Sequence, residues 1–240
     1  MSVRSTLEFP KFVGFPESGL SFLRRLKRNN NREWFQAHKS EFEESLLRPM
    51  QSLVAELRDI LAPVAPSVRI DPKKSIFRIY RDIRFSQDKS PYKTHLAASF
   101  ENESVSRAEA PCFYLHIAPD EVLTAGGIYM PSSAQLRAIR QEISADARAF
   151  VQLVEDRRIK RAFGELQGER LLRTPLGFPK DHPMLRYLQF KQLYFGRSYK
   201  VSACHKAAFV HQVADDFIQL LPFIDWLTRA LGPEQGRERK

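Results

Sequence analysis

The spacing of hydrophobic residues changes twice along the chain, and these changes constrain the fold more than any other feature. Near the N-terminus Leu20, Leu23 and Leu26 recur at helical spacing. From Lys74 apolar and polar residues alternate with a period of two, which is typical of strands. From Pro131 the helical period returns. We therefore expect an α+β fold, with a central, mainly antiparallel sheet of about four to five strands flanked by N-terminal and C-terminal helices.

The individual elements follow from the same pattern. Strands are expected at Ser75–Phe85, His95–Phe100, Cys112–Ala118 and Val122–Tyr129. Among the helices, one is capped by Asn31, one begins near Ser132, a short one spans Met184–Phe190, and the last is bent or divided by Pro222. An edge strand is expected between Arg170 and Ser198. The aromatic stripe of Trp34, Phe35, His38 and Phe42 is interpreted as core rather than as a binding platform.

Composition bounds the class of protein. The chain has 240 residues, of which 43% are hydrophobic, and this is enough for one sizeable core. We expect a single domain over residues 1–231 and a disordered tail over 232–240. No apolar run is long enough to span a bilayer, and two cysteines are too few for a disulfide framework. These features predict a cytoplasmic protein that does not associate with membranes.

Basic residues exceed acidic ones, with a formal net charge of +10 and a pI near 9.7. This excess favours polyanions, phosphorylated ligands or acidic partners. Three separate clusters of cations stand out, namely Arg24–Arg32, Arg157–Arg161 and the segment Arg78–Lys93. No nucleic-acid-binding motif accompanies them.

The segment Arg78–Lys93 is the most distinctive part of the sequence. As a strand, SIFRIYRDIRF places Arg78, Tyr80, Asp82 and Arg84 on one face and Phe77, Ile79, Ile83 and Phe85 on the other, with Arg81 breaking the apolar face. The loop that follows adds Asp88, Lys89, Tyr92 and Lys93. Guanidinium groups match phosphates and carboxylates in two-pronged geometry, so this segment predicts an anion site. An internal network of ion pairs that only fixes the loop explains the same residues equally well.

The segment RIYRDIRFSQDKSPYKTH resembles the signature of a bacterial and fungal family known as domain of unknown function 2461. Further similarity lies in NNNREWFQAHKSEFE, FYLHIAPDEVLTAGGIYMPSSAQLRAIR and TPLGFPKDHP, so the resemblance extends from about Phe15 to Phe195. Ala125 stands where the family pattern leads us to expect a third glycine. The resemblance implies a shared fold and supplies candidate positions; it implies no reaction, cofactor or partner.

Two further positions are candidates for the same site. His116 alternates with the apolar residues of its strand and is expected on the polar face, as an acid, a base or a structural histidine. Gly126 and Gly127, on the adjoining strand, leave room for a ligand against the backbone or mark a bulge. No spacing of histidines or cysteines predicts a metal, and the DHP turn at Asp181 and His182 is explained by helix capping. No cofactor can be named.

The sequence thus predicts a domain that binds a small anionic ligand bearing phosphate or carboxylate. Arg78, Tyr80, Arg81, Arg84, Asp88, Lys89, Tyr92, Lys93, Gly126 and Gly127 are the predicted ligand-binding residues. If the protein is a hydrolase or transferase, Asp82 and His116 are the residues expected to handle protons. A nucleic-acid-binding module and a non-catalytic interaction domain are the alternatives.

Overall fold

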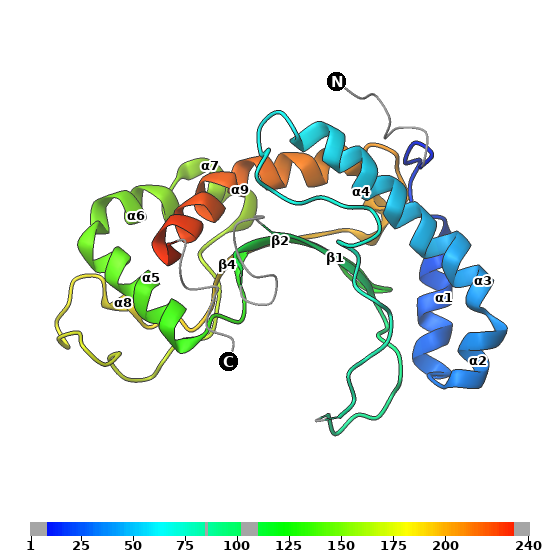
Figure 1. Cartoon of the computed structure of the whole chain (residues 1–240), viewed down its shortest axis with the longest axis horizontal. Helices are drawn as coiled ribbons and strands as arrows, with labels where there is room; N and C mark the ends of the chain where they lie inside the picture. Colours follow the sequence, from blue (N-terminus) through cyan, green and yellow to red (C-terminus); the bar gives the residue numbers. More distant parts are fainter. Residues whose placement is uncertain (1–8, 85, 102–109, 233–240) are drawn as a thin grey trace. The chain divides into compact units, whose positions relative to one another are not determined.

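The computed structural model describes residues 9–84, 86–101 and 110–232 (Figure 1). Its helices are α1 Glu17–Arg28, α2 Arg32–Ala37, α3 Lys39–Phe42, α4 Arg48–Leu61, α5 Ser133–Ala145, α6 Ala147–Val154, α7 Arg157–Phe163, α8 Leu185–Leu188 and α9 Phe209–Leu231, with a π-helical turn at Glu43–Leu47 and a 3₁₀ turn at Val201–Ala203. Its strands are β1 Leu96–Glu101, β2 Cys112–Ile117, β3 Val122–Ile128 and β4 Leu193–Tyr199.

The chain divides into two compact units. Unit 1 comprises Met1–Phe100, Tyr114–Thr124 and Ser198–Asp215, and unit 2 comprises Glu101–Phe113, Ala125–Arg197 and Asp216–Lys240. Each of the four strands contributes residues to both units. The single domain expected over residues 1–231 therefore stays a prediction. The predicted tail lies outside the described residues, apart from Gly232.

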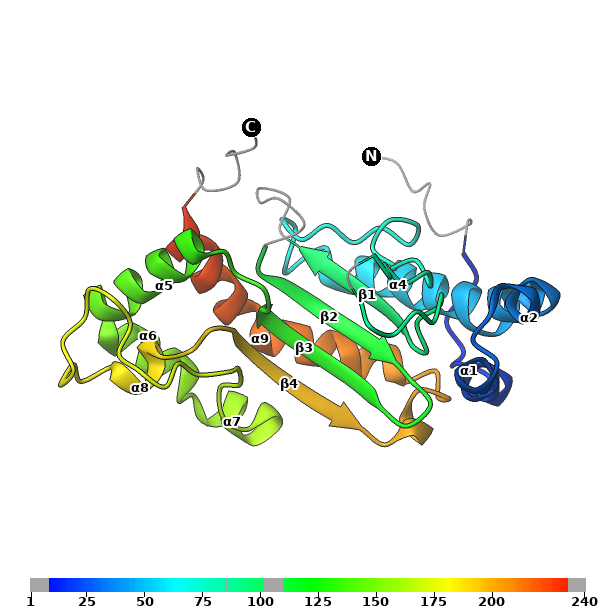
Figure 2. The same ribbon diagram turned by 90° about the horizontal axis from the view of Figure 1, so that it is seen from below.

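The α+β prediction is confirmed. The strands form one antiparallel sheet in the order β1-β2-β3-β4, with α9 behind the strands in Figure 2. In unit 2 the ring of Phe113 stacks on Phe217 of α9 with centroids 4.7 Å apart. Alternation along β2 buries Phe113, Leu115 and Ile117 on one face and leaves Tyr114 and His116 half-buried on the other.

The helices of unit 1 form as the sequence predicts. The Asn31 side chain accepts a hydrogen bond from the Trp34 amide at 2.9 Å and caps α2. Phe35 and Phe42 are buried and contact one another with centroids 5.6 Å apart, so these members of the aromatic stripe are core. Pro49 stands in the first turn of α4, where its missing N–H costs no helical hydrogen bond.

The helices of unit 2 are also close to the prediction. Ser132 and Gln135 form a capping box that begins α5. The short helix predicted over Met184–Phe190 is α8, and the predicted edge strand is β4. Pro222 does not divide the last helix, because α9 continues on both sides of it. In the described ranges no helix is long and apolar enough to cross a membrane.

The strand predicted over Ser75–Phe85 is wrong for the described residues. Only Ile76 and Tyr80 make isolated antiparallel bridges, to Ala98 and Tyr92, and the remainder is irregular. The carboxylate of Asp82 accepts a hydrogen bond from the Arg84 amide two residues later at 3.2 Å. Such local bonds compete with a strand ladder, so the alternating faces inferred for this segment do not form. Phe85 lies outside the described residues.

Candidate anion-binding site

Residues 79–84 and 86–93 belong to a loop that leaves the sheet and returns to it (Figure 1). The Arg81 amide donates to the Pro91 carbonyl at 2.9 Å, and the Lys93 amide donates to the Ile79 carbonyl at 2.8 Å. Together with the bridge between Tyr80 and Tyr92, these bonds close the loop at its base. We refer to these residues as the 79–93 loop.

The helical part of unit 1 holds the base of this loop through Asn30. Its side chain donates to the Tyr92 carbonyl at 2.9 Å and accepts from the Tyr92 amide at 3.0 Å, as a neighbouring strand would. The Tyr92 ring stacks on Phe35 with centroids 4.1 Å apart, and the residue is 1% exposed. Burial raises the pKa of its phenol. Tyr92, predicted as a ligand-binding residue, thus anchors the loop, whereas Tyr80 is half-exposed beside it.

The charged residues at the far end of the loop pair with one another. We call the side chains of Arg81, Asp82, Arg84, Asp88 and Lys89 the loop tip; the backbone of Arg81 lies at the base of the loop. Arg84 forms a two-pronged pair with Asp82, at 3.0 Å from Nε to Oδ1 and 2.7 Å from Nη2 to Oδ2. Arg81 pairs with Asp88, and the Lys89 ammonium donates to the Ile83 carbonyl at 3.0 Å. The internal network that the sequence left open as an alternative is therefore present at the tip.

These contacts determine the protonation of both tip carboxylates. The hydrogen bonds from Arg84 lower the pKa of Asp82 to about 2. Hydrogen bonds from Ser90, followed by that from Arg81, lower the pKa of Asp88 to about 2. Both groups are therefore ionised at neutral pH, and a carboxylate with so low a pKa is a weak base.

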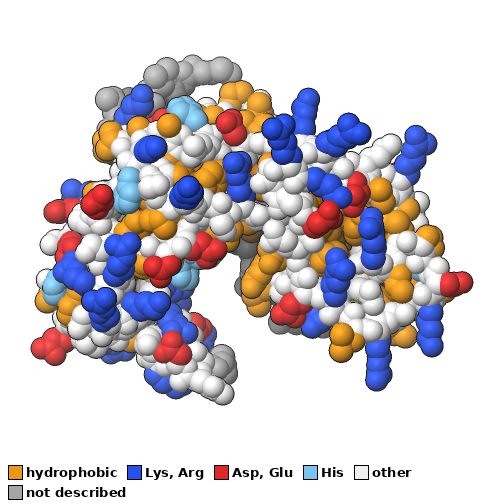
Figure 3. Space-filling view, turned by 180° about the vertical axis from the view of Figure 1, so that it is seen from behind, with side chains coloured by type: hydrophobic (Ala, Val, Ile, Leu, Met, Phe, Trp, Pro, Cys, Tyr) orange, Lys and Arg blue, Asp and Glu red, His pale blue; other side chains and the backbone are white. Residues whose placement is uncertain are grey.

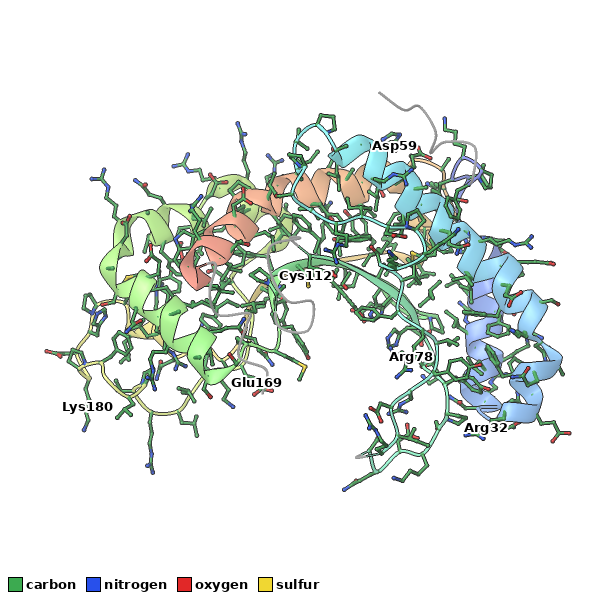
Figure 4. All side chains as sticks on the ribbon, in the orientation of Figure 1. Arg32, Asp59, Arg78, Cys112, Glu169 and Lys180 are labelled. Carbon is green, nitrogen blue, oxygen red and sulfur yellow. The ribbon has the colours of Figure 1, made fainter. Side chains whose placement is uncertain are left out.

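Arg78 and Lys93 lie together near the start and end of the loop and differ from the tip. Arg78, labelled in Figure 4, is exposed, and Lys93 is half-buried with its ammonium 5.1 Å from the centroid of the Phe77 ring. Burial lowers the pKa of Lys93, and the charge of Arg78 lowers it further. Among the described residues, no carboxylate forms a close ion pair with either cation, although the charge of Arg78 contributes to the lowered pKa of Asp82.

Two stacked imidazoles adjoin these cations. The rings of His95 and His116 are nearly parallel, with centroids 4.9 Å apart. Burial, followed by the charges of His116, Lys93 and Arg81, lowers the pKa of His95 to about 4. Burial likewise lowers the pKa of His116, opposed by Glu121. Both rings are therefore neutral at pH 7. We call Arg78, Lys93, His95 and His116 the basic cluster.

The surroundings of His116 leave its Nε2 atom incompletely satisfied. Nδ1 is 3.4 Å from the Tyr114 hydroxyl, whereas Nε2 is buried and has no hydrogen-bond partner among the described residues. Glu121 Oε2 lies 3.7 Å from Nε2, beyond hydrogen-bond distance. The Phe77 ring, over which the Lys93 ammonium lies, also contacts the Tyr114 ring, with centroids 6.5 Å apart. The polar face of β2 is thus continuous with the two cations.

A family model described as conserved hypothetical protein (DUF2461) matches residues 18–226. The chain belongs to this family. No curated protein matches the sequence. Family membership confirms the resemblance noted in the sequence, and the matched range includes the whole basic cluster.

Gly126 and Gly127, predicted as ligand-binding residues, lie against other protein atoms of unit 2. A Cβ atom at Gly126 would lie 3.0 Å from Cδ1 of Leu220 on α9. One at Gly127, where φ is +150°, would lie 2.2 Å from the carbonyl oxygen of Leu193. Both glycines therefore permit close approach of neighbouring protein atoms, which explains their presence without a ligand.

The other histidine considered in the sequence, His182, has a structural role. Its Nδ1 accepts from the Met184 amide at 3.1 Å, which assigns the proton to Nε2. Nε2 then donates to the Ser144 hydroxyl 3.0 Å away, the opposite of what a general base for that serine requires. Within residues 9–84, 86–101 and 110–232, no group of three His, Cys, Asp or Glu side chains is placed to hold a metal ion.

Sequence reasoning missed two residues of the candidate site. His95 is two residues beyond Lys93, and side chains at that spacing share one side of an extended chain, so the alternation could have found it. No local pattern indicates the role of Asn30, because Tyr92, whose backbone it binds, lies 62 residues away in the sequence.

Proposed function

We propose that the protein binds a small anion, bearing phosphate or carboxylate, at the basic cluster. The observation that carries this proposal is the proximity of Arg78 and Lys93, neither of which forms a close ion pair with a carboxylate of the described residues, although the charge of Arg78 also acts on Asp82. Two like charges repel each other, and partial burial of Lys93 increases the cost. A bound anion would remove this repulsion. The loop tip needs no such ligand because Asp82 and Asp88 already neutralise its arginines.

The neighbouring His95 suits an anion because it donates a hydrogen bond without adding charge. At neutral pH the imidazole of His95 carries one N–H that can donate to an anion, whereas His116 faces the Tyr114 hydroxyl through Nδ1 and has its Nε2 buried. A neutral donor beside two fixed cations is well suited to an oxyanion, whose oxygens accept from several directions. Phe77 and Tyr80 are exposed to 38% and 47% and offer apolar surface for the remainder of a ligand.

If the bound anion undergoes hydrolysis or group transfer, His116 is better placed than Asp82 to move a proton. The imidazole is neutral and lies between the Tyr114 hydroxyl and Glu121, so it can accept a proton through Nδ1 while the carboxylate stabilises the charge that develops. Asp82 is held by Arg84. The enzymatic step is therefore proposed for His116 and not for the aspartate.

The cysteines are consistent with this assignment. Burial raises the pKa of both Cys112 and Cys204 to about 11, so neither is a thiolate nucleophile at neutral pH. Both are free thiols, which supports the proposed cytoplasmic location.

The alternative of nucleic-acid binding has weaker support. In the Arg24–Arg32 cluster, Arg24 donates to the Pro119 carbonyl at 3.4 Å, and Arg25 pairs with Glu41 and lies over Trp34. Lys and Arg side chains are scattered over the face seen in Figure 3, with Asp and Glu among them. A phosphate backbone is tracked by a continuous basic stripe, so a small anion is favoured.

Calorimetric titration with inorganic phosphate and with citrate, at low ionic strength, tests the proposal. Arg78→Gln should weaken binding about tenfold, the equivalent of one charge-assisted hydrogen bond, without lowering the thermal midpoint. Arg84→Gln is the matched control, because it removes the same charge from a residue already paired, and it should bind like the wild type.

Equal affinity of wild type and Arg78→Gln would reject the proposal. Binding of an RNA or DNA oligonucleotide that weakens steeply with salt, without binding of either small anion, would favour the nucleic-acid alternative. Loss of thermal stability in Arg78→Gln, together with no anion binding by the wild type, would favour an interaction domain whose charged segment only fixes the loop.

A further inference from the structure

Unit 2 has a cavity of about 430 Å³ that the proposed function does not use. One wall is the segment that follows Glu169 and precedes Lys180, both labelled in Figure 4. Its volume is within the range of about 300–1,000 Å³ that is usual for sites of small organic ligands. Its lining residues all belong to unit 2, so the cavity is separate from the basic cluster.

The cavity is strongly cationic, because its lining residues include Arg140, Arg170, Arg173 and Lys191. Arg140 is held rigidly, because Nε donates to the Leu188 carbonyl at 2.7 Å and Nη2 to the Phe190 carbonyl at 3.1 Å. Arg170 is held by its guanidinium, 4.4 Å from the centroid of the Phe190 ring. Two of the guanidiniums are therefore fixed in place before any ligand arrives.

The acidic residues of the described chain leave most of this charge uncompensated. Glu169 pairs with Lys191 at 3.1 Å. No carboxylate of the described residues forms an ion pair with Arg140, Arg170 or Arg173. Burial lowers the pKa of Arg140, which reflects the cost of holding its charge away from water. A cavity lined by cations in this way concentrates anions.

Apolar residues also line the cavity. Leu172 and Leu176 are both among its lining residues and are 100% and 99% exposed. Single exposed leucines are common on protein surfaces, but two fully exposed leucines that line one cavity offer apolar area that a ligand can cover favourably. The charged residues alone would suit inorganic phosphate, whereas the leucines add a preference for hydrocarbon.

We propose that this cavity binds an amphipathic organic anion, in which a carboxylate or phosphate group is attached to a hydrocarbon chain or ring. The anionic group lies against Arg170 and Arg173, and the hydrocarbon covers Leu172 and Leu176. A concave site of this volume favours a small molecule over a bilayer, whose surface cannot enter a cavity.

Octyl phosphate, used below its micelle concentration, is a suitable probe in calorimetric titration of the full chain. It should bind at least tenfold more tightly than inorganic phosphate, which has only the charge, or octanol, which has only the chain. Arg170→Gln with Arg173→Gln should weaken octyl phosphate binding at least tenfold, because two charge-assisted contacts are lost. Leu172→Ser with Leu176→Ser should weaken octyl phosphate binding and leave the binding of inorganic phosphate unchanged.

Arg157→Gln with Arg158→Gln is the matched control, since it removes the same charge from exposed positions on α7 outside the cavity. It should bind octyl phosphate like the wild type, as should Arg78→Gln, which separates this site from the basic cluster. Equal affinity for octyl phosphate and inorganic phosphate would overturn the proposal. So would an equal loss of affinity in the α7 control, or binding to phosphatidylglycerol vesicles without binding to octyl phosphate.

Discussion

The loop tip and the basic cluster both contain arginine and lysine side chains, but these cations have different partners. At the loop tip, Arg81 and Arg84 each have an aspartate partner, and Lys89 donates to a backbone carbonyl. In the basic cluster, Arg78 and Lys93 form no close ion pair with a carboxylate of the described residues and adjoin two neutral histidines. A charged run in a sequence is therefore not one functional unit. What distinguishes a candidate binding site from a structural network is the pairing of each cation, which depends on how the loop folds.

The largest expected effect concerns the anchoring of the loop. Tyr92→Ala should lower the free energy of unfolding by about 3–5 kcal/mol, as is usual for truncation of a fully buried aromatic ring. Tyr80→Ala is the matched control, because its ring is 47% exposed in the same part of the loop, and its cost should be far smaller. Urea denaturation measures both. Similar values for the two variants would mean that Phe35 and Tyr92 do not fix the base of the loop.

The sequence predicted those parts of the fold that depend on local patterns. The helix capped by Asn31, the start of a helix near Ser132 and strand β2 all follow from spacing and residue type. The run Ser75–Phe85 was predicted as a strand because its apolar residues alternate. In the structure the Asp82 carboxylate accepts a hydrogen bond from the Arg84 amide, and Tyr80 forms a bridge to Tyr92 of the same loop, so no continuous strand forms. Alternation alone does not distinguish a strand from an extended loop of this kind.

The candidate site was predicted only in part, because long-range contacts decide it. Arg78, Lys93 and His116 were named from the sequence and lie in one cluster. Tyr92 was named as a ligand-binding residue and is a buried anchor, a role set by Asn30 far away in the chain. The partners of Arg84 could not be assigned either, since a neighbouring aspartate and a bound anion satisfy a guanidinium in the same way.

A second prediction uses the titration of His95. Its pKa is about 4 in the folded protein against 6.5 ordinarily, so the unfolded chain binds more protons between these pH values. The free energy of unfolding should therefore fall as pH drops from about 6.5 to about 4, with a contribution on the order of 1–3 kcal/mol from this residue. Urea denaturation across this range should show a steeper fall for the wild type than for His95→Asn.

The comparison with His95→Asn is needed because other groups titrate in the same range. His116, whose pKa burial also lowers, contributes in the same direction and remains in the variant. A wild type and variant with parallel pH profiles would show that His95 is not held neutral by its surroundings. Added phosphate gives a further test, because an anion bound beside the imidazole would raise its pKa and reduce the difference between the two profiles.

The smallest effect is expected at the loop tip. Asp82→Asn removes the partner of Arg84, but both side chains are exposed, and solvent screens such a pair so well that its loss should leave the urea midpoint unchanged within error. Phosphate affinity should also stay the same, since the freed Arg84 belongs to the tip and not to the basic cluster. A variant that instead bound phosphate more tightly would show that Arg84 can join an anion site once its aspartate is removed. Asp82 would then compete with the ligand for Arg84, and the loop tip would differ from the basic cluster only because an aspartate already occupies its arginine.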